Sequence, residues 1–308
     1  MRIVALRALG LGDLLTAVPA LRALRALPGA RVTVAAPAAL RPIAALAGCD
    51  LVAAAPLAPL AAALHHADLL VNLHGRGPAS HRIALGAVPE RLIAFAHPAV
   101  PATAGLPDWR AGEHEVLRWC RLLEASGVPA DPARLGLPAP PLPERLTAAR
   151  GATVVHPGAA SGARRWPAAR YAAVAGELAR SGQRVVITGS PAERRLAADV
   201  ARRAGLPAGA VLAGATYLLE LAAVVANAAR VVCGDTGVAH LATAFAVPSV
   251  LLFGPTSPAT WGPVDPGTGR HRVLWAGQEG DPHAARTDPG LLAIRPQDVL
   301  TELAMLPA

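Results

Sequence analysis

The sequence predicts an α/β protein built from two Rossmann-like halves with parallel sheets. Short apolar strands alternate with helices in each half, and this alternation is typical of parallel sheets. The 308 residues are enough for two domains of ordinary size. Hydrophobic residues make up 53% of the chain and aromatic residues only 3%, a mixture that suits buried strands covered by helices.

The first half alternates from its first residues onward. The spacing of apolar residues predicts strands and helices in turn. In chain order these are the strand Arg2–Leu6, the helix Leu14–Leu27, the strand Arg31–Ala35, the helix Pro59–His65, the strand Leu69–Asn72 and the helix Glu113–Ser126.

A proline-rich segment follows. Pro129 to Pro143 contains six prolines, which is too many for a helix and unfavourable for a strand. We therefore expect a linker between a first domain at 1–140 and a second domain at 150–308. Two such halves imply a ligand-binding cleft between them.

The second half restarts the same alternation and ends in an amphipathic helix that begins with a proline. We expect this final helix in the second domain, with packing back onto the first domain as the alternative. The elements are the strand Thr153–Val155, the helix Ala168–Ser181, the strand Arg184–Thr188, the helix Ala192–Ala204, the helix Tyr217–Ala228, the strand Val231–Cys233, the helix Val238–Phe245, the strand Val250–Phe253, a polar loop at Gln278–Gly290 and the helix Pro296–Leu306.

The net charge of +8 comes entirely from arginine, because the chain contains no lysine. The arginines are scattered and do not alternate with aromatic residues, so we expect no nucleic-acid partner. An enzyme that handles phosphorylated substrates, or one that touches anionic lipid, fits the charge equally well. The charge alone does not choose between them.

Cysteine use and hydropathy exclude several other classes. Cys49, Cys120 and Cys233 are far apart in apolar contexts, which favours core positions over disulfides or a zinc site. No Asp-x-Asp motif or histidine cluster at ligand spacing occurs, so we expect no metal. The first residues indicate a strand rather than a signal peptide, and prolines and glycines interrupt the uncharged stretch from Thr236 to Val264. We therefore expect a cytoplasmic protein.

The turn Leu9–Asp13 joins the first strand to the first helix. Gly10 and Gly12 permit a tight turn, but Leu15 stands where the dinucleotide-binding pattern needs a third glycine. Two interpretations of Asp13 remain open. It is an N-cap of the helix, or it is a general base at the carboxyl end of a strand.

The segment His156–Pro167 also follows a strand and precedes a helix. Its small residues would let a phosphate approach the backbone, Ser161 could donate a hydrogen bond, and Arg164 or Arg165 could neutralise the anion. The alternative is purely structural, with Trp166 and Pro167 starting a helix and both arginines solvated.

The loop Gly189–Glu193 places a carboxylate beside the same sheet edge. Glu193 could accept hydrogen bonds from ribose hydroxyls. The helix dipole alone also favours glutamate in a first turn, so this position is ambiguous.

The segment Gly234–His240 is the most informative. Asp235, Thr236 and Gly237 end a buried strand and begin a helix, whose free N–H groups and positive end favour a diphosphate. His240 lies one turn inside the helix, and we weigh a packed histidine against a ligand contact there.

Together these segments resemble glycosyltransferase family 9, the heptosyltransferase family. Val71–Gly75, which contains His74, and His114–Ser126 are similar to weaker family segments in the first half. The stronger matches occur in the family's order at Leu9–Asp13, His156–Pro167, Gly189–Glu193, Asp235–His240 and Phe253–Pro258.

The resemblance implies the GT-B fold, in which two Rossmann-like domains face each other across a cleft. It implies that the first domain binds an acceptor, through a loop with Gly10, Gly12 and His74, and that the second binds the donor. Asp13 matches the general base of an inverting, metal-independent transfer. Arg164 stands where the family usually has lysine, a change that keeps the charge and alters the shape.

For the donor site, the resemblance implies that Thr236 and Gly237 bind the diphosphate and Glu193 the ribose, with Ser161, Arg165, Asp235 and His240 in the same site. The expected partners are a nucleotide diphosphate sugar, with ADP-heptose the usual donor of the family, and a glycan or lipid-linked acceptor. No further cofactor is expected. Peripheral contact with the inner membrane surface is compatible with the charge.

Two other functions fit the same segments. One is a nucleotide-sugar-binding protein without transfer activity. This alternative is suggested by Arg164, which stands where the family usually has lysine. The other is a nucleotide-sugar epimerase, which would need no acceptor. A Rossmann dehydrogenase ranks last because the glycine pattern is incomplete.

Overall fold

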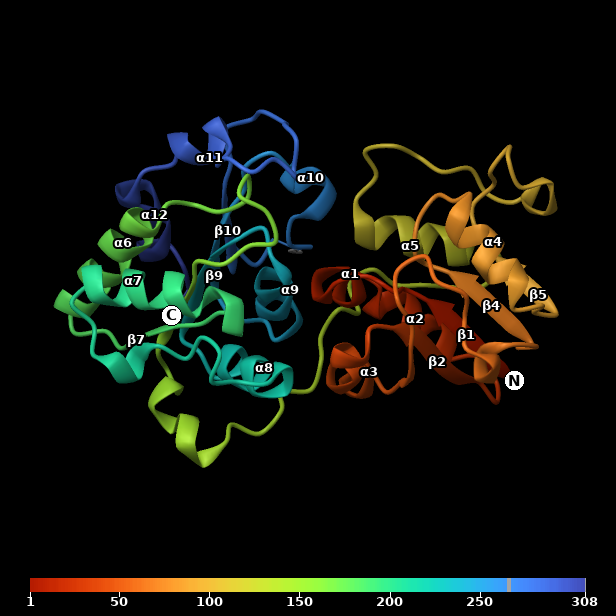
Figure 1. Cartoon of the computed structure of the whole chain (residues 1–308), viewed down its shortest axis with the longest axis horizontal. Helices are drawn as coiled ribbons and strands as arrows, with labels where there is room; N and C mark the ends of the chain where they lie inside the picture. The colour runs from red at the N-terminus through yellow and green to blue at the C-terminus, as the bar shows by residue number, and fades with distance from the viewer. Residues whose placement is uncertain (265–266, 308) are drawn as a thin grey trace. The chain divides into compact units, whose positions relative to one another are not determined.

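The computed structural model describes residues 1–264 and 267–307, so the predicted domain end at Ala308 lies outside the described residues. The chain divides into two compact units, Met1–Leu137 and Pro138–Ala308. Each unit holds its own parallel sheet with helices packed around it (Figure 1). The predicted α/β fold with two parallel sheets is confirmed.

The first unit is built on a parallel sheet with strand order β3-β2-β1-β4-β5. The central strand β1 pairs with β2 on one side and with β4 on the other, so that Ile3 lies opposite both Val32 and Leu69. The chain therefore changes direction across the sheet between β1 and β4, which makes this the topological switch point. The strands are β1 (Arg2–Leu6), β2 (Arg31–Ala36), β3 (Asp50–Ala53), β4 (Leu69–Asn72) and β5 (Arg91–Ile93).

Five α-helices accompany this sheet among the described residues. Helix α2 packs against β2 and α5, and α5 contributes Trp119, which is fully buried. The helices are α1 (Leu11–Thr16), α2 (Val18–Arg25), α3 (Arg41–Leu46), α4 (Ala79–Gly86) and α5 (Glu115–Glu124).

Two predicted helices of this unit differ from the structure. The predicted helix Leu14–Leu27 is two helices that meet at Ala17, and Pro19 lies in the first turn of the second one, where its missing N–H costs nothing. The predicted helix Pro59–His65 is wrong, since only a single 3₁₀ turn forms at Ala62–Leu64. Pro59 is tolerated in a first turn, but a segment this short forms too few intrahelical hydrogen bonds to hold a longer helix.

The second unit has a parallel sheet with strand order β10-β9-β8-β6-β7. Strand β6 pairs with both β7 and β8, so the switch point of this sheet lies between β6 and β8. The strands are β6 (Thr153–His156), β7 (Val185–Ile187), β8 (Arg230–Gly234), β9 (Ser249–Leu252) and β10 (His271–Leu274).

The core of this unit lies between the sheet and α6, α7 and α12, around Trp166, Tyr171 and Val299. Helix α12 packs against α6, β9 and β10. It therefore belongs to the core of the second unit. The helices are α6 (Ala168–Arg180), α7 (Arg194–Arg203), α8 (Leu218–Ala226), α9 (Gly237–Ala244), α10 (Pro258–Trp261), α11 (Pro289–Ala293) and α12 (Pro296–Ala304).

The proline-rich segment 129–143 contains no helix or strand. A 3₁₀ helix at Glu144–Ala149 follows it and leads into β6. The predicted polar loop Gln278–Gly290 is irregular as far as Pro289, where α11 begins.

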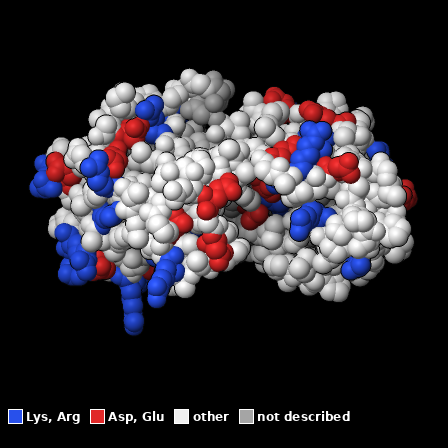
Figure 2. Space-filling model, turned by 90° about the horizontal axis from the view of Figure 1, so that it is seen from above, with Lys and Arg blue, Asp and Glu red and all other residues white. Residues whose placement is uncertain are grey.

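Basic and acidic side chains are interspersed on the face seen in Figure 2. Exposed arginines pair with acids of their own helices, as Arg180 does with Glu177 and Arg203 with Asp199. Within the described ranges, every helix is too short or too polar to cross a bilayer.

A buried polar network fixes the end of β4. Asn72 donates hydrogen bonds through Nδ2 to Ser80 Oγ at 3.1 Å and to His81 Nδ1 at 3.0 Å. The opposite ring nitrogen of His81 donates to the carbonyl oxygen of Phe95 at 2.7 Å. Both ring nitrogens therefore suit a neutral imidazole. Burial lowers the pKa of His81, and the Phe95 carbonyl opposes that effect.

We predict that this histidine makes stability depend on pH below neutrality. Between the ordinary value of 6.5 and the lowered pKa of His81, the unfolded chain binds a proton that the folded chain does not. Stability therefore falls as pH falls through this window, by at most about 1.4 kcal/mol per pH unit for one group. Urea unfolding at pH 7, 6 and 5 should show a shallower loss for His81→Gln than for the wild type. Equal slopes would contradict the assignment.

Candidate functional site

The first candidate half-site lies at the switch point of the first sheet. Arg7 directly follows β1, and Leu73 and His74 directly follow β4, its neighbour in the sheet. The carboxyl ends of parallel strands at a switch point are where open α/β sheets bind ligands.

Asp13 occupies the third position of α1, and Gly10 is the N-cap. The Asp13 Oδ2 accepts a hydrogen bond from the Gly10 N–H at 3.1 Å, and its Oδ1 lies 3.2 Å from Arg7 Nη2. The interpretation of Asp13 as the N-cap itself is therefore wrong. The carboxylate caps the turn from inside the helix, and its side chain remains 26% exposed. Since each carboxylate oxygen can accept more than one hydrogen bond, capping leaves room for a ligand.

Arg7, whose side chain is 1% exposed, lies outside every motif that the sequence offers. Its Nε donates to the Asp13 carbonyl oxygen at 2.9 Å, and its Nη2 lies 3.1 Å from Glu115 Oε1. Its Nη1 donates to the Leu73 carbonyl oxygen, and the guanidinium lies 4.8 Å from the centre of the Trp119 ring. The available signal was a single arginine directly after an apolar strand.

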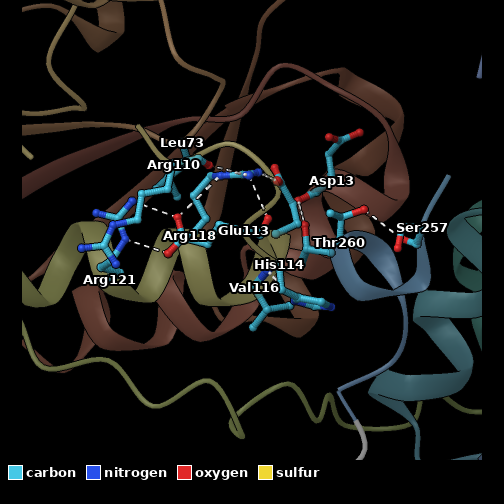
Figure 3. A network of polar contacts seen from close by, with 12 residues as sticks. Asp13, Leu73, Arg110, Glu113, His114, Val116, Arg118, Arg121, Ser257 and Thr260 are labelled. Carbon is cyan, nitrogen blue, oxygen red and sulfur yellow. Dashed lines mark hydrogen bonds and ion pairs between the residues drawn. The ribbon is translucent and has the colours of Figure 1, made fainter. Parts of the chain in front are cut away.

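The network continues along the start of α5. Glu115 also pairs with Arg118, whose guanidinium stacks on the Trp109 ring at 4.1 Å. One turn further, Arg121 forms an ion pair with Glu113, with 2.6 Å between Nε and Oε1. Figure 3 shows Asp13, Glu113, Arg118 and Arg121 in this one network. Buried charges of opposite sign alternate along it, so each charge has a partner.

His74 lies beside Arg7 and Asp13. Its backbone N–H donates to Asn72 Oδ1 at 3.0 Å, and its Nδ1 is buried without a partner among the described residues. Burial lowers the pKa of His74, the Arg7 cation lowers it further, and the Asp13 carboxylate raises it. A neutral imidazole with an unpartnered nitrogen can form a hydrogen bond with a ligand.

The second candidate half-site lies where three neighbouring strands of the second sheet end. Residues 157–167 follow β6, the loop Gly189–Glu193 follows β7, and Asp235 and Thr236 follow β8. This group includes both strands of the switch point, so the structure brings together three of the segments singled out in the sequence.

The Glu193 side chain lies against the loop that follows β6. Its Oε2 accepts a hydrogen bond from the Ser190 N–H at 2.7 Å, and a Cβ on Gly158 would lie 2.1 Å from its Oε1. Glycine at position 158 therefore makes room for the carboxylate. His156, at the end of β6, has its Nδ1 3.0 Å from Thr188 Oγ1. Burial lowers the pKa of His156, and the Glu193 carboxylate opposes that effect.

Arg164 and Asp235 join the β6 loop to the turn after β8. Arg164 Nη1 lies 3.3 Å from Asp235 Oδ2, and the Asp235 side chain is only 7% exposed. Gly234 permits the approach, because a Cβ there would lie 3.2 Å from the Arg164 carbonyl oxygen. The Nε of Arg164 is buried without a partner among the described residues. The guanidinium therefore has donor capacity left for a ligand.

Thr236 and Gly237 open α9 as predicted. Thr236 is the N-cap in an extended conformation, and its buried hydroxyl has the Cys233 thiol, a weak hydrogen-bonding group, as its neighbour. The first N–H groups of a helix have no partner inside it, so this end can bind an anion. His240 lies one turn further along and packs edge-to-face on Trp261 at 6.1 Å between ring centres.

Ser161 and Arg165 are engaged by other parts of their own unit. The Ser161 hydroxyl donates to the Pro282 carbonyl oxygen at 2.6 Å, and Arg165 Nη2 donates to the Ala159 carbonyl oxygen at 3.0 Å. The predicted hydrogen bond from Ser161 to a phosphate would require its bond to Pro282 to break.

The segment 282–288 acts as a strap over the β6 loop. Ala163 donates through its N–H to the Ala284 carbonyl oxygen at 2.9 Å and accepts from the Asp288 N–H at 3.1 Å. A Cβ on Gly162 would lie 1.8 Å from the Ala285 carbonyl oxygen, so only glycine fits beneath the strap. The strap therefore holds the loop that carries Arg164.

Within residues 1–264 and 267–307, no group of three or more His, Cys, Asp or Glu side chains is placed to hold a metal ion. The three cysteines are buried, and burial raises the pKa of Cys49 to about 11 and that of Cys233 to about 12. Both thiols therefore stay protonated at neutral pH.

The family model of glycosyltransferase family 9 (heptosyltransferase) matches residues 106–289, more than half of the chain. The chain belongs to glycosyltransferase family 9. The match includes the β6 loop, Glu193 and the start of α9, which are the parts of the second half-site.

Two curated relatives match part of the chain. Lipopolysaccharide heptosyltransferase 2 of Salmonella typhimurium is 34% identical over 161 residues, which cover 49% of this chain and 45% of the relative. Lipopolysaccharide heptosyltransferase 1 of Pseudomonas aeruginosa is 42% identical over 98 residues, which cover 32% of this chain and 27% of the relative. The matches thus span less than half the length of these relatives.

Solved structures match almost the whole chain. The Escherichia coli ADP-heptose lipopolysaccharide heptosyltransferase II has a TM-score of 0.78 at 23% identity, with 99% of this chain and 98% of the other covered. A family 9 glycosyl transferase from Veillonella parvula has a TM-score of 0.78 at 21% identity, with coverage of 99% and 96%. The GT-B fold class of the chain is therefore confirmed.

We predict that Gly162→Ala destabilises the second unit. The new methyl group would force the Ala285 carbonyl away, and such overpacking typically costs about 1–3 kcal/mol. Gly209→Ala is the matched control, because a Cβ there meets nothing within 4 Å. Thermal unfolding should show a lower midpoint for Gly162→Ala only. Equal midpoints in the two variants would show that the strap does not hold the loop.

Proposed function

We propose that this chain transfers a heptose from ADP-heptose to a lipopolysaccharide-type acceptor, with inversion at the sugar carbon and without a metal ion. One observation carries the proposal: a partly exposed carboxylate, Asp13, and an anion-binding helix start at Thr236 each lie at the switch point of a parallel sheet. Family membership and the names of the relatives support the choice of sugar.

The donor would bind to the second half-site. We assign the diphosphate to the first turn of α9, at Thr236 and Gly237, and the ribose hydroxyls to Glu193. Arg164 would offset the charge of the departing diphosphate, with Asp235 holding the guanidinium in place. Helix start and cation together would do the work that a metal ion does in other transferases.

Other residues around the donor would support its binding without contacting the reacting atoms. The buried hydroxyl of Thr236 has only the weak Cys233 thiol beside it, so a phosphate oxygen would be a stronger hydrogen-bond partner. Arg165 and His240 would border the donor. Ser161 would join the site only after leaving Pro282.

The acceptor would bind to the first half-site. Its hydroxyl proton would pass to the Asp13 carboxylate while the hydroxyl oxygen attacks the sugar carbon. The bond from that carbon to the diphosphate would break on the opposite face, and ADP would leave with the bonding electrons. A single displacement of this kind inverts the configuration. Gly10 and Gly12 would let the acceptor approach the backbone, and His74 Nδ1 would form a hydrogen bond with it.

We place the reaction in the cytoplasm, with peripheral contact at the inner membrane surface. A lipid-linked acceptor requires the protein to work near anionic headgroups, and the net charge of +8 favours such contact.

A nucleotide-sugar-binding protein without transfer activity is the second candidate. The observation that favours it is the ion pair between Arg164 and Asp235, which already neutralises much of the cation meant for the diphosphate. Release of ADP that depends on a heptose-deficient lipopolysaccharide would exclude it. An isomerised sugar formed from donor alone would instead indicate an epimerase.

We predict that Asp13→Asn lowers the rate of ADP release by about 10²–10⁴-fold, the usual contribution of a general base. Binding of ADP, followed as thermal stabilisation, should not change, because the donor binds in the other unit. Asp68→Asn, at an exposed acid of the first unit, is the control. A folded Asp13→Asn variant with a near wild-type rate would remove Asp13 from the mechanism.

We predict that Arg164→Met weakens ADP binding about 10–100-fold, because a hydrogen bond to a charged group is worth about 1.5–3 kcal/mol. Arg164→Lys should weaken ADP binding less than Arg164→Met does, since lysine keeps the positive charge. Arg180→Met, at a largely exposed arginine of α6, should bind ADP like the wild type. Titration calorimetry with ADP, UDP and GDP measures these affinities and identifies the base. Equal affinities for all four proteins would place the diphosphate elsewhere.

A further inference from the structure

We propose that Arg7 is a positioning residue that holds the Asp13 carboxylate in the orientation needed to remove the acceptor proton. The inference rests on the proposed function, because it assigns Arg7 a role through Asp13. No segment singled out in the sequence contains Arg7, and its role follows from four sets of contacts.

Arg7 holds Asp13 at two points. Its Nε donates to the Asp13 carbonyl oxygen at 2.9 Å, and its Nη2 lies 3.2 Å from Asp13 Oδ1. The first contact is a hydrogen bond and the second is an ion pair, because the hydrogen bonds of Nη2 go to Thr16 Oγ1 and Glu115 Oε1. Main chain and side chain of Asp13 are therefore fixed by the same group.

Thr16 completes this anchor. Its hydroxyl donates to the Asp13 carbonyl oxygen at 2.9 Å and lies 3.3 Å from Arg7 Nη2. The carbonyl of Asp13 thus accepts two hydrogen bonds, and the short helix α1 is tied to the end of β1.

Arg7 is itself immobilised. Its side chain is 1% exposed, pairs with Glu115 Oε1 at 3.1 Å and donates to the Leu73 carbonyl oxygen. The Trp119 ring supports the guanidinium from one side at 4.8 Å. A buried cation with this many partners has essentially one orientation, so it transmits the rigidity of β1, β4 and α5 to Asp13.

The opposite oxygen of Asp13 has a different anchor. Asp13 Oδ2 accepts the Gly10 N–H at 3.1 Å, while Oδ1 faces Arg7. The plane of the carboxylate is therefore set from two sides. Without Arg7 only the Gly10 contact would remain, and the carboxylate could rotate about it. Misplacement of a catalytic group by about 1 Å can cost about 10²-fold in rate.

A purely structural role for Arg7 predicts a different result. Arg7, Glu115 and Arg118 form one buried network. Loss of either arginine should lower stability, because the buried Glu115 carboxylate would then pair with only one positive charge. Arg118 has no contact with Asp13 among the described interactions, and Arg7 stays paired with Glu115 without it. Arg118→Gln is therefore the matched control.

The experiment measures kcat and the dissociation constant of ADP for the wild type, Arg7→Met, Arg7→Lys and Arg118→Gln. The substrates are ADP-heptose and a heptose-deficient lipopolysaccharide. We expect Arg7→Met to lower kcat about 10–100-fold with unchanged ADP affinity. Arg7→Lys should recover at least part of this loss, and Arg118→Gln should retain the wild-type kcat despite a lower unfolding midpoint.

A double mutant separates positioning from general damage. If Arg7 acts through the Asp13 carboxylate, Arg7→Met in the Asp13→Asn background should lower kcat little further. Additive losses in the double mutant would overturn the inference. So would equal losses of kcat in Arg7→Met and Arg118→Gln, or a wild-type kcat in Arg7→Met.

Failure of this inference can be told apart from failure of the proposed function. A wild-type protein that transfers no heptose, or a folded Asp13→Asn variant that keeps its rate, contradicts the proposed function. A slow Asp13→Asn variant beside an Arg7→Met variant of normal kcat contradicts only the role of Arg7.

Discussion

The ion pair between Arg7 and Asp13 is the constraint on which the first half-site depends. A guanidinium with 1% exposure is stable in the core only because carboxylates, carbonyl oxygens and an aromatic ring surround it. Those partners come from α1, from the residue after β4 and from α5, while Arg7 itself follows β1, so one cation ties together the elements that meet at the switch point. Its consequence at the surface is a carboxylate that is exposed enough to meet a ligand and is held by Arg7 on one oxygen and by Gly10 on the other.

In the second half-site, too, an ion pair and backbone hydrogen bonds hold the charged side chain in place. Asp235 orients Arg164 at the end of β8, while the strap 282–288 holds the loop from which Arg164 projects. Glycines at 158, 162 and 234 let side chain and backbone approach closely where a Cβ would collide.

The sequence predicted the central strands well because burial on both faces makes them continuous apolar runs, as in Leu69–Asn72. Edge strands such as β10, which is only half-buried, lack that signal. The segment Pro59–His65 had helical spacing, but it is too short to hold a helix and forms a single 3₁₀ turn. Arg7 and the engagement of Ser161 by Pro282 could not be predicted, because their partners lie up to 121 residues away in the chain.

The stereochemistry of transfer tests the account most directly. A fixed carboxylate that removes the acceptor proton during one displacement must produce a glycoside of the configuration opposite to that of the donor. The one-bond carbon–proton coupling at the anomeric position of the product, measured by NMR on heptose transferred from ADP-heptose, reports this configuration. The account predicts inversion. Retention would require a second displacement or attack from the same face, and would contradict the role given to Asp13.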